Sequence, residues 1–116
     1  MIKRRLWIDG SYRLGFIGYG VYGRPGDIKL YGGQPGVDSH SAELLAAEKA
    51  LETVRDGEAC TLYTDSHPVI AFYAATPISR IRLTVAHIKR VDAFHNIAHE
   101  LANLGREQAY RKRSVE

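Results

Sequence analysis

Three acidic residues of this 116-residue chain lie within or directly after apolar segments. Asp9 follows Leu6-Trp7-Ile8, Asp65 follows the apolar run 60–64, and Glu43 stands beside small alanines. Carboxylates that meet away from water repel one another and ionise less readily, so a fold keeps such a group when a cation offsets the cost. Oxygen ligands favour Mg²⁺ or Mn²⁺, and two such ions about 4 Å apart are suited to phosphodiester hydrolysis. Taken alone, Glu43 has a simpler explanation, because an early acidic residue helps a helix to begin.

The elements that must bring these acids together follow from hydrophobic periodicity and turn residues. Leu44, Ala47, Leu51 and Val54 recur at helical spacing, and Ser41 is the predicted N-cap of that helix. The Gly-rich stretch 32–38 lacks the pattern of a phosphate-binding loop and is interpreted as a connector. The predicted elements are strands 4–12, 16–22 and 28–31, a helix from 40 to 56, strand 60–64, helix 67–75, strand 81–88 and helix 94–110. The tail from Arg111 is expected to fray.

This order predicts an α/β fold with one five-stranded mixed sheet. Three strands joined by tight turns form an antiparallel meander, and two crossovers then add two parallel strands, with about three helices covering both faces. The first strand lies centrally beside the fourth, so Asp9 and Asp65 become neighbours at the carboxyl ends where open α/β sheets hold their sites. The length is that of one domain, residues 1–116.

Composition limits the function classes. The chain is 45% hydrophobic and 25% charged, and no apolar run approaches the roughly 18 residues of a membrane span. No signal peptide is recognisable, and the single cysteine, Cys60, indicates a buried, inert thiol in a reducing compartment, so we expect a cytoplasmic protein with no membrane partner. A net charge of +3 permits a polyanionic partner. The basic clusters are Lys3-Arg4-Arg5, Arg80 with Arg82, Lys89-Arg90 and Arg111-Lys112-Arg113.

Three short motifs contain the three acidic residues, and their order and spacing can be compared with those of known protein families. Asp9-Gly10-Ser11, Ala42-Glu43-Leu44-Leu45-Ala46 and Thr64-Asp65-Ser66 occur in order, with 34 residues from Asp9 to Glu43 and 22 from Glu43 to Asp65. Order and spacing resemble those of the type 1 ribonuclease H family over nearly the whole chain. The resemblance implies the ribonuclease H-like fold and a metal-dependent endonuclease that cleaves the RNA strand of RNA–DNA hybrids with two Mg²⁺ or Mn²⁺ ions.

The resemblance also implies roles for individual residues. Asp9 would bridge both ions, and Glu43 and Asp65 would hold the second. Gly10, Ser11, Ser39 and His40, the last two before the helix, would contact the RNA strand, where hydrogen bonds to the 2′-hydroxyl distinguish RNA from DNA. His67 would contact the substrate backbone. Capping or surface roles are the structural alternatives for these polar residues.

The chain departs from the family in its last helix. The family's fourth acidic ligand is replaced by His99, which would support the first metal, favour Mn²⁺, or have a purely structural role. His95 lies one turn earlier on the same face, so a His-x-x-x-His zinc pair is a second interpretation. His87 and His95 are both candidates for the family's flexible histidine.

The chain also departs from the family in the length of the segment before its last strand. Only residues 76–80 separate the second helix from the last strand, so the family's basic helix is missing, and Lys89-Arg90 or the 111–113 cluster would have to replace its grip on the hybrid. Two other functions therefore compete with hybrid cleavage: a nuclease for branched or duplex nucleic acid, and an inactive nucleic-acid-binding module.

Overall fold

The centre of the molecule is a five-stranded sheet in the order β3-β2-β1-β4-β5. The computed structural model describes residues 3–89 and 92–115. The strands are β1 (Lys3–Arg13), β2 (Phe16–Arg24), β3 (Ile28–Pro35), β4 (Ala59–Thr64) and β5 (Arg82–His87). β1, β2 and β3 pair antiparallel, whereas β4 pairs parallel with both β1 and β5. The predicted mixed sheet with a central first strand is therefore confirmed.

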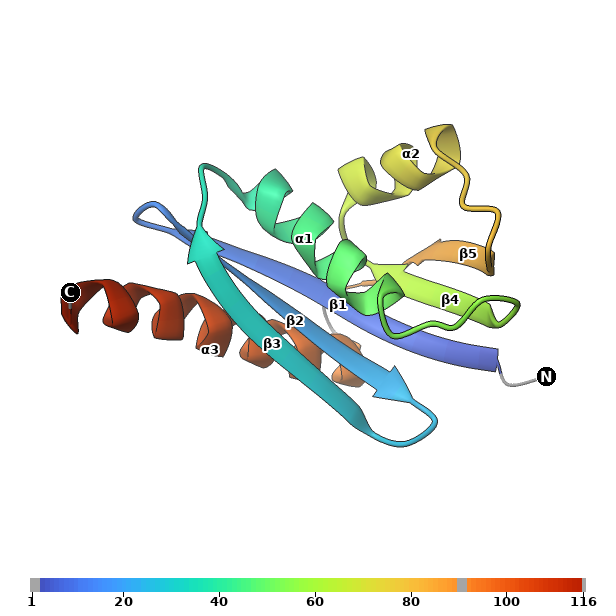
Figure 1. Cartoon of the computed structure of the whole chain (residues 1–116), viewed down its shortest axis with the longest axis horizontal. Helices are drawn as coiled ribbons and strands as arrows, with labels where there is room; N and C mark the ends of the chain where they lie inside the picture. The colour runs from blue at the N-terminus through green and yellow to red at the C-terminus, as the bar shows by residue number, and fades with distance from the viewer. Residues whose placement is uncertain (1–2, 90–91, 116) are drawn as a thin grey trace.

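Helices cover both faces of this sheet (Figure 1). α1 (Ser39–Leu51) and α2 (His67–Ala75) lie on one face, and the long α3 (Ala93–Val115) crosses the other. None of the helices formed by the described residues is both long and apolar enough to cross a membrane.

Strand alternation decides which way Asp9 points. Leu6 and Ile8 on β1 are fully buried against α1, whereas Trp7 packs against Phe94 of α3, with ring centroids 4.7 Å apart. Because successive side chains of a strand face opposite sides, Asp9 shares the α3 face with Trp7. Trp7 pairs with Tyr63 of β4, so Asp65, which directly follows the end of this parallel strand, lies near Asp9.

Glycines let α3 lie directly on the sheet. A β-carbon at Gly20 of β2 would overlap the backbone of Ala98, and one at Gly105 of α3 would overlap the backbone of Gly32 on β3. The same holds for Gly18 against the backbone at Arg106. This contact between backbones fixes both the height and the rotation of α3 above β1.

We expect Gly20→Ala to destabilise the protein by about 2 kcal/mol or more, because α3 or β2 must shift to admit the methyl group. Thermal unfolding followed by circular dichroism should show a melting temperature about 8 °C lower. Glu100→Ala, an exposed change on the same helix, is the control and should change the free energy of unfolding by less than about 0.5 kcal/mol. Equal melting temperatures for the two variants would contradict the packing argument.

The Gly-rich stretch 32–38 is a connector only over residues 36–38. Gly32 and Gly33 pair with Tyr19 and Gly18 of β2, so β3 continues to Pro35. Glycine is unfavourable in an isolated strand, but here the ladder to β2 and the backbone of α3 at Gly105 supply the contacts that side chains would otherwise make.

The predicted limits of the first helix were also wrong. Asp38, not Ser41, is the N-cap: its Oδ1 accepts hydrogen bonds from the backbone N–H and the hydroxyl of Ser41, both at 2.8 Å. The helix therefore begins at Ser39, which puts Glu43 beyond the first turn. It ends at Leu51 rather than near residue 56, because Arg80 donates hydrogen bonds to the carbonyls of Leu51 and Val54, at 2.7 and 2.6 Å.

Two predictions for the last helix need correction. The segment from Arg111 continues α3 to Val115 and does not fray. Helical periodicity from Ile97, Ala98 and Leu101 predicts that Leu104 also faces inward, but its side chain is 52% exposed, and Gly105 lies against β3 in its place. Cys60 is buried as predicted, and desolvation raises the pKa of its thiol to about 11.

Candidate active site

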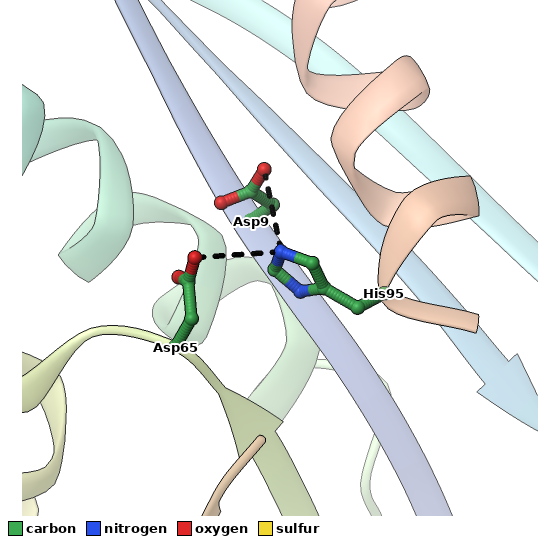
Figure 2. Close-up of side chains that lie close together, drawn as sticks. All are labelled: Asp9, Asp65 and His95. Atoms are coloured by element: carbon green, nitrogen blue, oxygen red, sulfur yellow. Dashed lines mark ion pairs between the residues drawn. The ribbon is translucent and has the colours of Figure 1, made fainter. Parts of the chain in front are cut away.

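Two carboxylates and an imidazole meet where β1 and β4 lie side by side (Figure 2). His95 Nε2 lies 3.5 Å from Asp65 Oδ2 and 3.9 Å from Asp9 Oδ2. Ligand atoms of the three residues all lie within 4.8 Å of one another. Asp9 and His95 are 4% and 3% exposed, so the cluster is largely shielded from water.

Local hydrogen bonds position two of these side chains. At the end of β4 the Thr64 hydroxyl accepts a hydrogen bond from the backbone N–H of Ser66, at 3.0 Å, and Ser66 caps α2, so the turn carrying Asp65 is held on both sides. Before α3, the Asp92 carboxylate accepts hydrogen bonds from the backbone N–H groups of Phe94 and His95, at 2.9 and 3.0 Å. This cap places His95 in the first turn of α3, facing β1.

Glu43 approaches the cluster from α1 on the other side of β1. A β-carbon at Gly10 would overlap the backbone of Ala42 and Glu43, so only glycine lets α1 approach so closely. Burial first, and then the charges of Asp9 and Asp65, raise the pKa of Glu43 to about 9 from the usual 4.5. Among the described residues, no group forms a hydrogen bond with the buried Oε2 of Glu43. Buried carboxylate oxygens in proteins nearly always have a partner, so this oxygen is available to a water molecule or a cation.

The pKa of His95 is raised, whereas burial alone would lower the pKa of a histidine. Burial lowers its pKa, but the hydrogen bond with Asp65 and the charges of Asp9 and Asp65 outweigh that effect and raise the pKa overall. The nearby carboxylates therefore favour the protonated imidazole, whose charge would offset part of theirs.

His99, expected in place of the family's fourth acid, lies one turn further along α3. Its Nδ1 is 2.6 Å from Asp9 Oδ2, and its side chain is 57% exposed. Its Nε2 lies 3.4 Å from the amide nitrogen of Asn103. Because Nδ1 contacts the carboxylate, the imidazole holds Asp9 in place from the solvent side.

The four predicted ligands open onto one cavity of about 410 Å³. Its lining residues are Asp9, Gly10, Ser39, Glu43, Asp65, His95, Asn96 and His99. Gly10 and Ser39, predicted to touch substrate, are thus placed at this cavity. Ser39 lies in the first turn of α1 and not before the helix as expected.

Three other predicted substrate contacts do not line the cavity. Ser11 is buried and bonds to α3 through Asn103 and Arg106. His40 is exposed in the first turn of α1. His67 is exposed at the start of α2 and stacks on His87 of β5, with ring centroids 4.7 Å apart.

The residues present fit a divalent cation. Asp9 and Asp65 offer oxygens, His95 offers Nε2, and the unpaired oxygen of Glu43 adds a further donor. Mixed oxygen and imidazole ligands suit Mn²⁺ and other transition ions better than Mg²⁺, which prefers oxygen alone. An imidazole nitrogen binds a cation only in its deprotonated form, so metal binding through His95 Nε2 would depend on pH.

Comparison with known proteins identifies the fold. One solved structure, a ribonuclease H1 isolated from compost by a metagenomic approach, superposes with a TM-score of 0.67 over 95% of this chain and 99% of that chain, at 18% sequence identity. The chain has a ribonuclease H-like fold. The sequence matches no family model, and no curated protein matches it.

The sequence did not predict that His95 joins Asp9 and Asp65; it suggested only a zinc partner of His99 or a flexible histidine. A detectable signal was present, because His95 and His99 are four residues apart and share a helix face.

Two of the predicted basic clusters can be compared with the structure. Arg80 caps the end of α1, and Arg90 lies outside the described residues. The described residues 76–81 contain no helix, which agrees with the missing basic protrusion.

Proposed function

We propose that this protein is a divalent-metal-dependent nuclease that hydrolyses the RNA strand of RNA–DNA hybrids. The observation that carries the proposal is the convergence of Asp9, Asp65 and the strongly perturbed Glu43 on one cavity of a ribonuclease H-like fold. Perturbed carboxylates that share a cleft are costly for stability, and they occur mainly where function requires them.

In this proposal the residues that line the cavity have different roles. Divalent cations, when bound, polarise the scissile phosphate and supply a nucleophilic water at neutral pH. Asp9 would hold both cations, Glu43 and Asp65 would complete the second position, and His99 keeps Asp9 in place through its contact at 2.6 Å. His95 would add a nitrogen ligand to Asp9 and Asp65 and favour Mn²⁺ over Mg²⁺.

Substrate choice would come from the rim of the same cavity. The backbone at Gly10 and the hydroxyl of Ser39 are near enough to the acids to contact the strand that is cut. A 2′-hydroxyl both donates and accepts hydrogen bonds, so these groups can select RNA over DNA. Ser11, His40 and His67 would act only further along the substrate.

The test is cleavage of four labelled substrates by the purified protein in Mg²⁺ or Mn²⁺: an RNA–DNA hybrid, duplex RNA, duplex DNA and a four-way DNA junction. We expect cleavage of the RNA strand of the hybrid alone, faster in Mn²⁺. Asp65→Asn should slow it about 100-fold, because a lost metal ligand costs several kcal/mol of transition-state stabilisation.

Asp56→Asn is the matched control, since the Asp56 side chain is 83% exposed after α1, and it should cleave like the wild type. Cleavage of the junction or duplex DNA alone would replace the proposal with a repair-type nuclease. Binding without cleavage in either metal would instead indicate an inactive nucleic-acid-binding module.

A further inference from the structure

A polar seam runs from the acidic cluster along the contact between β1 and α3. Asp9, Ser11 and Arg13 alternate with their neighbours and therefore point to the same face of β1. The residues of α3 that follow this seam recur every three or four positions: His95, His99, Asn103, Arg106 and Tyr110. Asp9 contacts His99, and Ser11 donates a hydrogen bond to Asn103 Oδ1 at 2.8 Å. The seam is acidic at one end and basic at the other.

Arg106 is held firmly at the basic end. Its Nη1 donates a hydrogen bond to the Ser11 hydroxyl at 2.8 Å, its Nη2 donates to Glu107 Oε1 at 3.2 Å, and its side chain is only 16% exposed. The close approach of α3 at Gly18 fixes the backbone from which this side chain extends. A guanidinium restrained in this way has already lost most of the rotamer entropy that binding an anion would cost.

The Arg106 side chain lines a hollow of about 200 Å³ together with Arg13, Leu14, Glu107 and Tyr110. At about 30 Å³ for each water molecule, this volume exceeds what one phosphate group needs. The residues that line the hollow come from the β1–β2 hairpin and the second half of α3. The edge-on contact of Phe16 with Tyr110 joins these two elements. Two arginines facing one hollow match the geometry of phosphate, which guanidinium groups bind through paired hydrogen bonds.

We propose that Arg106 and Arg13 form a phosphate-binding site for the backbone of the nucleic acid whose scissile phosphate lies at the acidic cluster. The proposal rests on the proposed nuclease function. Arg13 is four residues beyond Asp9 on β1, a separation of roughly 13 Å at 3.3 Å per residue. The site would therefore hold a phosphate of the same nucleic acid beyond the scissile phosphate, on the side of the β1–β2 hairpin. It would supply part of the grip that the missing basic helix does not provide.

Glu107 lines the same hollow, and its Oε1 lies 3.2 Å from Arg106 Nη2. Its carboxylate opposes an incoming phosphate and competes for the guanidinium. Removing a cation and removing this anion should therefore change binding in opposite directions.

The experiment measures binding of a fluorescein-labelled RNA–DNA hybrid by anisotropy in Ca²⁺ at several salt concentrations. Arg106→Gln should raise the Kd about tenfold and reduce the slope of log K against log salt by about 0.9, because one phosphate contact is lost. Arg13→Gln should raise the Kd about threefold, since Arg13 is exposed and less restrained. Glu107→Gln should lower the Kd about threefold.

Arg55→Gln is the matched control, because Arg55 is an exposed arginine after α1, at the opposite end of that helix from the acidic cluster. It removes the same charge and should change the Kd by less than about twofold. Thermal unfolding of each variant verifies that it is folded, and Arg106→Lys, which keeps the charge without the fork, should bind with intermediate affinity. Equal binding by Arg106→Gln and Arg55→Gln would overturn the phosphate site.

A second measurement separates this inference from the proposed function. If the wild type binds no hybrid, the nuclease proposal fails, and titration with inorganic phosphate followed by the side-chain Nε–H resonances of the arginines decides the site by itself. A saturable shift at Arg106 with none at Arg55 supports a phosphate site that takes another ligand. The absence of such a shift rejects the site.

Discussion

Asp9→Asn should slow cleavage of an RNA–DNA hybrid about 1000-fold, equivalent to about 4 kcal/mol of transition-state stabilisation. Asp9 has three neighbours among the cavity residues: His99 at 2.6 Å, His95 at 3.9 Å, and Glu43 through a hydrogen bond. Asparagine has the same size, so the packing against α3 should survive. The lost charge removes the ligand that two cation positions would share.

The measurement is single-turnover cleavage in Mn²⁺, with calorimetric titration of Mn²⁺ in parallel. The variant should bind Mn²⁺ at least tenfold more weakly while its circular dichroism spectrum stays unchanged. Asp56→Asn again serves as the exposed control. A variant that retains a tenth of the wild-type rate would show that Asp9 does not hold the cation, and the two-metal interpretation would fail with it.

Glu43→Gln should stabilise the metal-free protein while it impairs cleavage. Glu43 has a pKa of about 9 in the folded protein and close to the usual 4.5 when unfolded. Between these values the unfolded chain releases a proton that the folded protein retains, so the stability of the wild type falls as the pH rises from about 4.5 toward 9. Glutamine has no proton to release. At pH 7 the variant should therefore be more stable by about 3 kcal/mol.

Urea unfolding in EDTA at pH 7 and pH 4 tests this prediction. The gain should be present at pH 7 and absent at pH 4, where Glu43 is protonated in both states. Glu48→Gln, an exposed change on the same helix, should alter the free energy of unfolding by less than about 0.5 kcal/mol at either pH. A gain independent of pH would mean that the effect comes from packing and not from the buried charge.

Asp9→Asn and Glu43→Gln both test a balance between the stability of the protein and its function. Glu43 is held close to Asp9 and Asp65, where burial and the charges of these two acids oppose its ionisation, and the imidazole of His95 lies between the two aspartates. Such an arrangement lowers the stability of the protein but gathers the donor atoms that a cation would need, as expected for a functional site.

Local patterns in the sequence determined the order of the strands, the span 67–75 of α2 and the convergence of Asp9, Glu43 and Asp65. Alternation along β1, the turns at residues 13–15 and 24–27, and the crossovers through α1 and α2 act over short distances, so they are legible without coordinates. The same reasoning failed where two local signals competed. Asp38 and Ser41 could both cap α1, and the hydrogen bond between them resolves the competition in favour of Asp38.

Only the tertiary structure decided how α3 faces the sheet. The backbone contacts of Gly18, Gly20 and Gly105 with neighbouring elements set the rotation of the helix. That rotation brings His95 between Asp9 and Asp65, leaves His99 on the solvent side and joins Arg106 to Ser11. Helical periodicity gives the relative angles of these residues but not the absolute angle at which the helix docks. The docking angle depends on contacts between residues about 80 positions apart, which no local pattern encodes.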